Sequence, residues 1–340
     1  MSVVDDPAGL TAAWLSDVLD APVASVSVAP LGTGQMAACH RLEVTYRGDG
    51  SAHPSRLVAK LPSPDPTVRT SVATAYRTEV TFYRDLAPRL PVPTPRCWFA
   101  DASEDGTAFT LLLDDMAPAT PGDQFAGCAP EAARAAAVAV AGLHAGSWCD
   151  PALAALDWLI PPMSAVAEPL QPMLADLTET FIAKRDLTPT TAEVFRHFAA
   201  GFAEWATTPA EPWSLIHNDY RLDNLLFAPA DASLPPVTAV DWQSLSTGLP
   251  LRDLAFLLGT GLDPESRRAH ERAIVSAYHA TLLSLGVTGY DAERCWEDYR
   301  HGLFQGPLIC VLGEAFAAPT ERGHRMFTVM AERAATAITG

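Results

Sequence analysis

The stretch that decides the fold is Leu215-Ile216-His217-Asn218-Asp219-Tyr220-Arg221-Leu222-Asp223-Asn224-Leu225-Leu226-Phe227. Apolar runs at both ends fix a polar loop between them. After that loop, residues 237–240 read as a buried strand that ends at Asp241. Taken singly, each of these acids is most often a turn former or a helix cap. Taken together, two carboxylates and a carboxamide that converge there would suit a hard cation such as Mg²⁺, which prefers oxygen ligands.

The spacing of these polar residues is more specific than any one of them. His217, Asp219 and Asn224 follow the pattern His-x-Asp-x-x-x-x-Asn, and a strand with a terminal Asp comes next. This is the order of a kinase catalytic loop and its metal-binding Asp. The pattern therefore predicts phosphoryl transfer.

The N-terminal region gives an independent test, because phosphoryl transfer needs a cation on the nucleotide phosphates. Lys60 ends a β-branched strand, and alternation places it on the same face as Val58. In the helix that follows, Glu79 falls on the apolar stripe, where an acid needs a buried partner. We expect Lys60 to be that partner. The alternative is that Glu79 turns outward to Arg77 or Arg84.

A glycine pair precedes the lysine strand. Gly32 and Gly34 flank Thr33 between two predicted strands, which by itself indicates a hairpin turn. Before a lysine strand, the same pair becomes a candidate phosphate-covering loop, because its N–H groups can approach phosphate oxygens. It is neither a Walker A loop nor a dinucleotide fingerprint, since a strand and not a helix follows it.

The organisation of the chain is bipartite. Strands are predicted at 23–31, 36–46, 56–61, 98–100 and 109–113, with helices at 8–20 and 67–87. After Asp114-Asp115-Met116 the sequence becomes helical and rich in Ala and Leu. We therefore predict an α+β protein with a β-rich, nucleotide-binding lobe at 1–115 and a larger helical lobe at 116–340, which binds the acceptor and carries the catalytic groups.

Composition limits the partners. Of 340 residues, 23 are Lys or Arg and 40 are Asp or Glu, a net charge of −17 that disfavours nucleic acid and anionic membranes. No uncharged apolar run is long enough to span a bilayer, and the chain start does not resemble a signal peptide. The six scattered cysteines indicate reduced thiols. We expect a cytoplasmic protein without nucleic-acid or membrane partners; the sequence leaves its oligomeric state open.

These motifs resemble the aminoglycoside phosphotransferase and choline-kinase-like branch of the protein-kinase-like fold, and within it the ecdysteroid-kinase-like phosphotransferases. The resemblance covers nearly the whole chain. It rests on the Gly loop, Val58-Ala59-Lys60, Glu79, Leu113 to Met116, His217 to Asn224, Asp241-Trp242 and Asp253-Leu254-Ala255.

The resemblance implies a role for each matching residue. Asp219 would be the catalytic base that orients the acceptor hydroxyl, and Asn224 and Asp241 would hold Mg²⁺. Lys60 would contact the α- and β-phosphates, and Glu79 would hold Lys60.

Further roles fall on supporting residues. The backbone of Asp114, Asp115 and Met116 would hydrogen-bond adenine, while His217 and Asp253 would support the catalytic loop. The family often has Gly where Asn218 stands. It commonly has Glu where Gln243 stands, which puts any second-metal role at that position in doubt.

Arg221 carries a separate hypothesis. It lies two residues after Asp219, an offset at which many protein kinases place a Lys that reaches the transferred phosphoryl group. A guanidinium there could bind the equatorial oxygens as a bidentate fork. The alternative is that Arg221 pairs with Asp223 or another acid and only shapes the loop.

The sequence thus predicts an ATP-dependent, Mg²⁺-requiring kinase that phosphorylates a hydroxyl of a small molecule. The alternatives are a nucleotide-binding regulatory module of the same fold and a divalent-metal phosphohydrolase. The acceptor stays open among an aminoglycoside, an amino sugar, choline and a lipophilic alcohol. Four acids could attract a cationic amine or simply be solvated: Asp263, Glu297, Asp298 and Glu314.

Overall fold

Contacts divide the chain into two units. The computed structural model describes residues 2–32, 36–48, 50–316 and 320–340. The first unit comprises Met1–Arg89, Thr94–Ala117 and Asp241–Ser244, and the rest of the chain forms the second. The segment that begins at Asp241 therefore packs with the N-terminal unit, although it follows that unit by more than a hundred residues.

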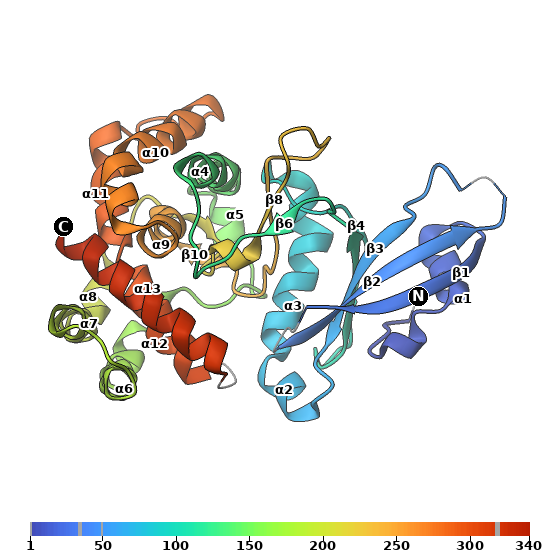
Figure 1. Ribbon diagram of the computed structural model, residues 1–340, viewed down its shortest axis with the longest axis horizontal. Coiled ribbons are helices and arrows are strands. Elements are labelled where there is room, and N and C mark those ends of the chain that lie inside the picture. The colour runs from blue at the N-terminus through green and yellow to red at the C-terminus, as the bar shows by residue number, and fades with distance from the viewer. Residues whose placement is uncertain (1, 33–35, 49, 317–319) are drawn as a thin grey trace. The chain divides into compact units, whose positions relative to one another are not determined.

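The first unit is built on one antiparallel sheet (Figure 1). Its strands run in the order β1-β2-β3-β5-β4. Their bounds are β1 Val23–Leu31, β2 Ala37–Tyr46, β3 Arg56–Pro62, β4 Cys97–Ala102 and β5 Phe109–Asp114. These bounds agree closely with the strands expected from alternation.

Alternation along β3 separates two environments. Leu57, Ala59 and Leu61 are buried in an apolar cluster with α1 (Ala12–Leu19). Lys60 points to the opposite face of the sheet, because successive side chains of a strand alternate. Its strand partners are Cys39 on β2 and Leu111 on β5, so Lys60 lies in the interior of the sheet and not at an edge.

The helix expected at 67–87 is divided. The chain forms α2 Pro66–Ser71 and α3 Ala73–Thr81, then a π-helical turn over Phe82–Leu86. The widened turn lets two consecutive aromatic residues, Phe82 and Tyr83, both be fully buried. Periodicity could not reveal this break, because the demand for it comes from a distant residue: Phe82 stacks on Trp242 with ring centroids 4.0 Å apart.

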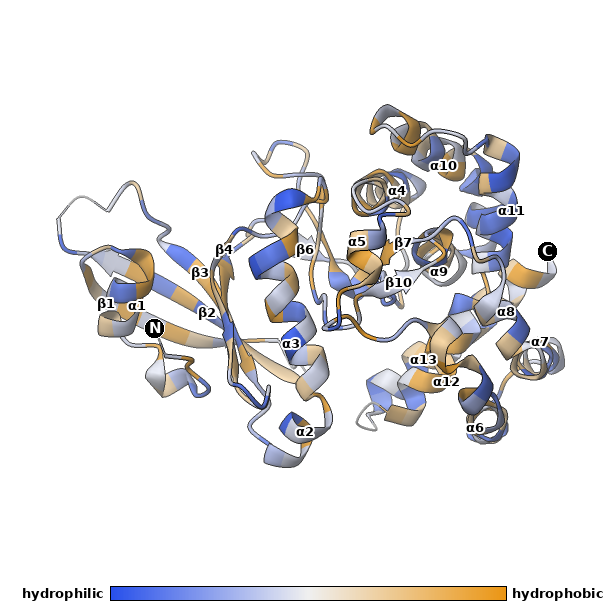
Figure 2. Cartoon of the chain, turned by 180° about the vertical axis from the view of Figure 1, so that it is seen from behind, coloured by the Kyte–Doolittle hydropathy of each residue, from blue (hydrophilic) through white to orange (hydrophobic). Residues whose placement is uncertain are grey.

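The second unit is mainly helical. Its helices are α4 Pro130–Ala145, α5 Pro151–Ala154, α6 Met163–Ala183, α7 Pro189–Ala200, α8 Phe202–Thr207, α9 Leu251–Gly261, α10 Pro264–Ser284, α11 Ala292–Gly302, α12 Gln305–Phe316 and α13 Glu321–Thr339. Every residue of α9 is buried, so this helix is the centre around which the others pack. In Figure 2, the outer helices α6 and α10 carry both hydrophilic and hydrophobic residues, as helices do that bury one side.

Short strands interrupt these helices. β6 Thr120–Pro121, β8 Leu225–Phe227 and β9 Val237–Ala239 form one small antiparallel sheet. β7 Ser214–Ile216 pairs with β10 Ser246–Gly248. The polar loop of the quoted stretch therefore starts at the end of β7 and finishes at the start of β8, and both ends are anchored by strand pairing.

The helices and the cysteines of the chain can be compared with the expectations of no membrane span and of reduced thiols. In the ranges given above, none of the helices combines the length and hydrophobicity that a bilayer crossing would need. All six cysteines are free thiols.

Candidate active site

The Asp219 carboxylate is the most heavily coordinated group of the polar loop. Nε of Arg221 lies 3.0 Å from its Oδ1, and Nδ2 of Asn224 donates to its Oδ2 at 2.8 Å. The same amide nitrogen donates to the Asp219 carbonyl at 2.9 Å. The Asp219 side chain nevertheless stays 26% exposed, so a substrate can reach it.

The contacts of Arg221 are those of the loop-shaping alternative, and its contact with the transferred phosphoryl group stays a prediction. Its Nη1 lies 3.0 Å from Oδ2 of Asp223, as the loop-shaping alternative requires. It also contacts Asp219, the expected base, and its Nη1 lies 3.1 Å from Sδ of Met326. The side chain therefore links two carboxylates of the loop, one of them expected to be catalytic.

A buried carboxylate on α9 supports the loop from within the unit. Asp253 has no exposed surface, and it accepts the backbone N–H of His217 at 2.6 Å and that of Asn218 at 2.9 Å. The buried His144 lies 3.3 Å from Asp253 through Nε2 and 2.7 Å from the Tyr278 hydroxyl through Nδ1. The support is thus a buried polar network.

The backbone explains the unusual residue after the loop histidine. Asn218 has a φ of 66°, in the left-handed region. Glycine adopts this region at no steric cost, and Asn is among the few other residues that tolerate it. The departure from Gly at this position therefore preserves the turn.

His217 and Asn224 also hold the strand that leads to Asp241. The ring Nε2 of His217 lies 3.0 Å from the carbonyl of Val240. The N–H of Val240 donates to the carbonyl of Asn224 at 3.0 Å. The loop and Val240, the residue before Asp241, are therefore fixed to each other by one side-chain contact and one backbone hydrogen bond.

Gln124 is a loop-supporting residue that the sequence gave no reason to select. It is fully buried; its Oε1 accepts the N–H of Leu222, and its Nε2 donates to the carbonyl and hydroxyl of Thr260. Its own N–H donates to Asp223 at 3.1 Å, and its carbonyl accepts from Arg333. Its flanking sequence, Gly122-Asp123-Gln124-Phe125, carries no signal of burial, and only the folded chain shows that the amide has partners for its polar atoms, as a buried amide needs.

In the first unit, one lysine binds two carboxylates. Nζ of Lys60 lies 2.6 Å from Oε2 of Glu79 and 2.8 Å from Oδ1 of Asp241. The alternative partners of Glu79 are engaged elsewhere: Arg84 pairs with Asp85, and Arg77 donates to the Glu104 carbonyl.

Burial controls the electrostatics of these three groups. Glu79 is 1% exposed and Lys60 12% exposed as side chains. Burial alone would lower the pKa of Lys60, but the charges of Asp241 and Glu79 together outweigh it, and the pKa is raised well above its usual value. Burial raises the pKa of Glu79 against the opposing charge of Lys60, and Asp241 adds to the rise. One cation thus neutralises only part of the charge of two carboxylates.

The segment from Asp241 is held in place by its neighbours. Asp241 has a φ of 69°, and its Oδ2 lies 3.4 Å from Nε2 of Gln243. The N–H of Trp242 donates to Oε1 of Glu79 at 3.3 Å, and the Trp242 ring is fully buried. Gln243, which stands where a Glu would be common, therefore acts here as a donor to Asp241.

The remaining predicted nucleotide contacts belong to the first unit. Asp114 ends β5 and accepts the indole N–H of Trp98 at 2.7 Å, while Asp115 pairs with Arg41 at 2.9 Å. Met116 follows them and is buried. Both acidic side chains already have partners. The groups of this segment that could hydrogen-bond a nucleotide base are therefore those of its backbone.

The glycine pair is described only in part. Gly32 has a φ of 72° and nothing within 4 Å of the place where a Cβ would stand, so its backbone conformation is what favours glycine there. Gly34 lies outside the described residues.

The donor sets fit Mg²⁺ on chemical grounds. Among the described residues, no group of three or more His, Cys, Asp or Glu side chains assembles a closed metal site. The expected ligands are instead a carboxylate, Asp241, and an amide, Asn224. Carboxylate and amide oxygens are ligands that a hard cation prefers, so each of these two residues by itself carries a suitable donor.

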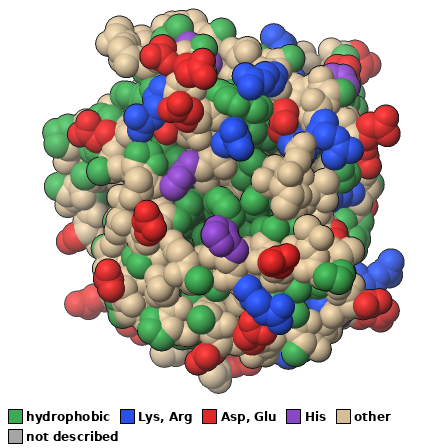
Figure 3. Space-filling model, turned by 90° about the vertical axis from the view of Figure 1, so that its left-hand side faces the viewer, with side chains coloured by type: hydrophobic (Ala, Val, Ile, Leu, Met, Phe, Trp, Pro, Cys, Tyr) green, Lys and Arg blue, Asp and Glu red, His purple; other side chains and the backbone are tan. Residues whose placement is uncertain are grey.

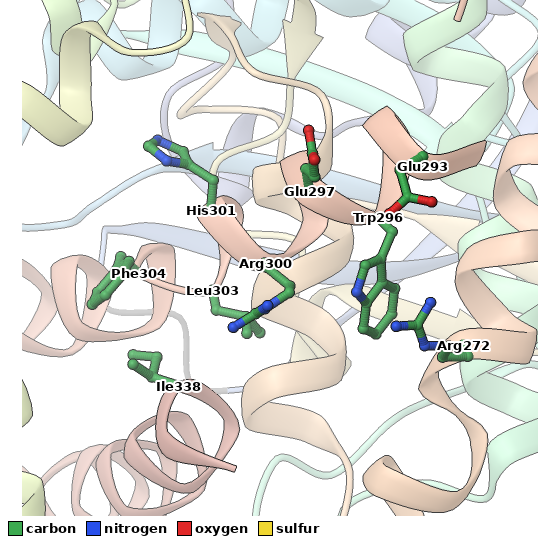
Figure 4. A pocket seen from close by; sticks show the side chains of 9 residues that line it. All are labelled: Arg272, Glu293, Trp296, Glu297, Arg300, His301, Leu303, Phe304 and Ile338. Atoms are coloured by element: carbon green, nitrogen blue, oxygen red, sulfur yellow. The ribbon is translucent and has the colours of Figure 1, made fainter. Parts of the chain in front are cut away.

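A separate cavity of about 560 Å³ opens in the second unit, where α10, α11 and the end of α13 supply its lining (Figure 4). Arg272 covers the ring of Trp296 at 4.0 Å, and Glu297 belongs to the same wall. Figure 3 views this end of the unit and shows hydrophobic side chains in a hollow rimmed by charged and histidine side chains. None of the predicted site residues lines the cavity. Glu297, one of the acids that could attract a cationic amine, lines this cavity. It therefore does not support an acceptor site beside Asp219.

Several solved structures of phosphotransferases and kinases have a fold similar to that of this chain. Choline kinase from Cryptosporidium parvum is 11% identical, with a TM-score of 0.57 over 91% of this chain and 88% of that one. The GDP complex of aminoglycoside 2'-phosphotransferase-IIIa is 15% identical, with a TM-score of 0.55 over 91% and 92%. An ADP-bound aminoglycoside phosphotransferase is 15% identical, with a TM-score of 0.51 over 96% and 97%. These similarities confirm the predicted bilobal, protein-kinase-like α+β fold.

The sequence was also compared with curated proteins and with models of protein families. Acyl-CoA dehydrogenase family member 11 of Gallus gallus is 44% identical over 43 residues, which are 13% of this chain and only 5% of that protein. A model described as the phosphotransferase enzyme family matches residues 43–294, the range that holds Lys60, Glu79, the Asp219 loop and Asp253. Since that range is well over half of the 340 residues, the chain belongs to the phosphotransferase enzyme family.

Proposed function

We propose that this protein transfers the γ-phosphoryl group of ATP to a hydroxyl of a small molecule. The observation that carries the proposal is Lys60, held by ion pairs to both Glu79 and Asp241. The two carboxylates fix the ammonium group of this buried lysine at a defined position, from which it can contact nucleotide phosphates. The nucleotides bound by two of the compared phosphotransferases, GDP and ADP, support a nucleotide as donor.

In this proposal, Asp219 binds the acceptor hydroxyl and takes its proton as the reaction proceeds. The acceptor oxygen forms a bond to the γ-phosphorus, the bond from that phosphorus to the β,γ-bridging oxygen breaks, and ADP leaves. Arg221 and Asn224 hold the Asp219 carboxylate in one orientation through the contacts described above. Positioning and electrostatic stabilisation account for most of the catalysis in such a reaction.

Asn224 and Asp241 are the residues that would hold Mg²⁺. The ion, when bound, would neutralise charge on the β- and γ-phosphates. Lys60 would contact the phosphates, and Glu79 would keep Lys60 in place. The backbone of residues 114–116 would hydrogen-bond the adenine base of the nucleotide.

Turnover of ATP tests this function directly. ADP formation is measured with a panel of alcohols, with and without Mg²⁺, for the native protein and for Lys60→Met. We expect acceptor-dependent ADP formation that requires Mg²⁺ and is nearly abolished in the variant. Nucleotide binding without turnover for every acceptor would favour the regulatory module of the same fold, and release of inorganic phosphate without acceptor would favour a phosphohydrolase.

A further inference from the structure

Three of the four acids that could have attracted a cationic acceptor have other partners in the second unit, and the fourth, Glu297, lines the cavity described above. Asp263 caps α10 by accepting backbone N–H groups at 3.0 and 3.2 Å. Asp298 pairs with Arg294 at 2.8 Å, and Glu314 pairs with Arg185 at 2.6 Å. None of them contacts Asp219. Among the described residues, these acids therefore supply no carboxylate beside the expected base for a polycation to bind.

The side chains that do surround the loop are cationic. Asp223 is shared by two guanidinium groups: Nη1 of Arg221 lies 3.0 Å from its Oδ2, and Nη1 of Arg322 lies 3.4 Å from the same oxygen. Because Arg221 also contacts Asp219, a continuous series of charged contacts runs from Asp219 to Arg322 at the start of α13. The Arg322 side chain is 61% exposed and can bind a ligand as well.

A second arginine of α13 joins this group. The guanidinium carbons of Arg322 and Arg325 lie 5.3 and 5.7 Å from the ring centroid of Phe125, which is half-buried. In the described part of the chain, no carboxylate forms an ion pair with Arg325, not even Glu321 one turn before it. The acid closest to Phe125 in sequence, Asp123, accepts the N–H of that residue at 2.8 Å.

This arrangement is unusual for the protein as a whole. The chain carries a net charge of −17, yet Arg221 and Arg322 pair with carboxylates of the loop, and Arg325 lies with Arg322 at the ring of Phe125. Phe125 adds an aromatic face, and Met326 lies in contact with Arg221. Paired arginines beside an aromatic ring favour an anionic group attached to an apolar body.

We infer that the acceptor is a hydroxyl compound that also bears an anionic group, a carboxylate or a phosphate, which Arg322 and Arg325 bind beside Phe125 while Asp219 binds the hydroxyl. The inference rests on the proposed function and specifies its substrate class. An aminoglycoside or choline would bring positive charge to the same arginines and would be disfavoured by like-charge repulsion.

Matched acceptors test the charge preference. A hydroxyalkanoate, its carboxamide and the corresponding amino alcohol differ mainly in charge, and hydroxyalkyl phosphates extend the series. We expect kcat/KM with ATP to fall in the order anion, neutral amide, amine, and kanamycin to be turned over least. Carboxylate and phosphate members compared at equal length show which anion the arginines select.

Charge-neutralising variants connect the preference to the residues. In the double variant Arg322→Gln/Arg325→Gln we expect kcat/KM for the anionic acceptor to fall about 5- to 30-fold, mainly through KM, because exposed charge pairs contribute modestly. Turnover of the neutral amide should stay within about twofold. Arg322→Lys/Arg325→Lys should recover part of the loss, and Arg268→Gln, an exposed arginine of α10, is the matched control.

The outcomes separate the inference from the proposed function. Equal or faster turnover of the amide and amine, or a double variant that loses all acceptors equally, overturns the anionic acceptor and leaves the kinase assignment standing. Absence of turnover with every alcohol overturns both. Thermal unfolding of each variant shows whether a loss reflects the fold.

Discussion

The Lys60 cluster of the first unit and the Asp219 loop of the second hold charged groups by different means. In the first unit, Lys60, Glu79 and Asp241 hold one another through ion pairs, and two of the three side chains are nearly buried. In the second, Asp219 and Arg221 are 26% and 20% exposed, and the loop is held mainly by backbone hydrogen bonds to the buried Asp253. Removing a charged group from the Lys60 cluster should therefore change the interactions of the other two groups. Removing the Asp219 carboxylate from the loop should lower the rate of the reaction with little effect on the fold.

The largest effect is expected at the exposed carboxylate. Asp219→Asn should lower kcat by about 10²- to 10⁴-fold, because base and positioning roles contribute on that scale. The loop should stay folded, since its main supports do not include this side chain. Steady-state kinetics and thermal unfolding together check the prediction; near-native turnover with an unchanged melting temperature would remove Asp219 from the role of base.

The buried support of the same loop should behave in the opposite way. Asp253→Asn leaves the shape but places an NH₂ group against backbone N–H donors, and we expect a loss of about 2–4 kcal/mol in the free energy of unfolding. Urea denaturation measures it. Asp263→Asn, at an exposed cap of α10, is the control and should cost about 1 kcal/mol or less.

Arg221 has two candidate roles, stabilising charge in the transition state and holding the shape of the loop. If it stabilises charge in the transition state, Arg221→Ala should lower kcat and kcat/KM together by about 10- to 1000-fold and leave KM for ATP nearly unchanged. Arg221→Lys should recover only part, because an ammonium group cannot bind the equatorial oxygens of the phosphoryl group as a bidentate fork does. Normal kcat with a raised acceptor KM would assign it to loop shape alone.

In the first unit, the expected signature is coupling. Lys60→Met and Glu79→Gln should give non-additive losses, with an interaction energy of about 0.5–3 kcal/mol in a double-mutant cycle on ATP affinity. Calorimetry measures each binding free energy. Strictly additive losses would mean that the 2.6 Å contact has no energetic consequence.

The smallest effect concerns pH and a residue outside both sites. Burial lowers the pKa of His301 from its usual 6.5, with Arg252 adding to the effect and the Trp205 carbonyl opposing it. The unfolded chain then takes up a proton at a higher pH than the folded chain does. Stability should therefore be fully present above pH of about 6.5 and decline as pH falls through the folded-state pKa.

His301→Gln isolates that contribution. The difference in unfolding free energy between about pH 7.5 and pH 5 should be smaller in the variant than in the native protein. An identical pH dependence in both proteins would show that His301 does not titrate differently on folding.

Much of the framework could be read from the sequence. The strands around Lys60 follow from alternation, and the position of Glu79 on an apolar stripe predicts its buried contact with a cation. The spacing from His217 to Asn224 selects the loop. These features depend on neighbours within a few residues or on local periodicity, so linear patterns record them.

The tertiary structure alone decided the long-range contacts. Gln124 reaches Thr260, His144 reaches Asp253 and Lys60 reaches Asp241 across more than a hundred residues of chain. Such contacts leave no periodic trace, because each depends on which elements pack together. For the same reason, only the folded chain brings Arg322 and Arg325 to Phe125 and pairs Arg322 with Asp223, so that arginines gather at the loop of a chain whose net charge is −17.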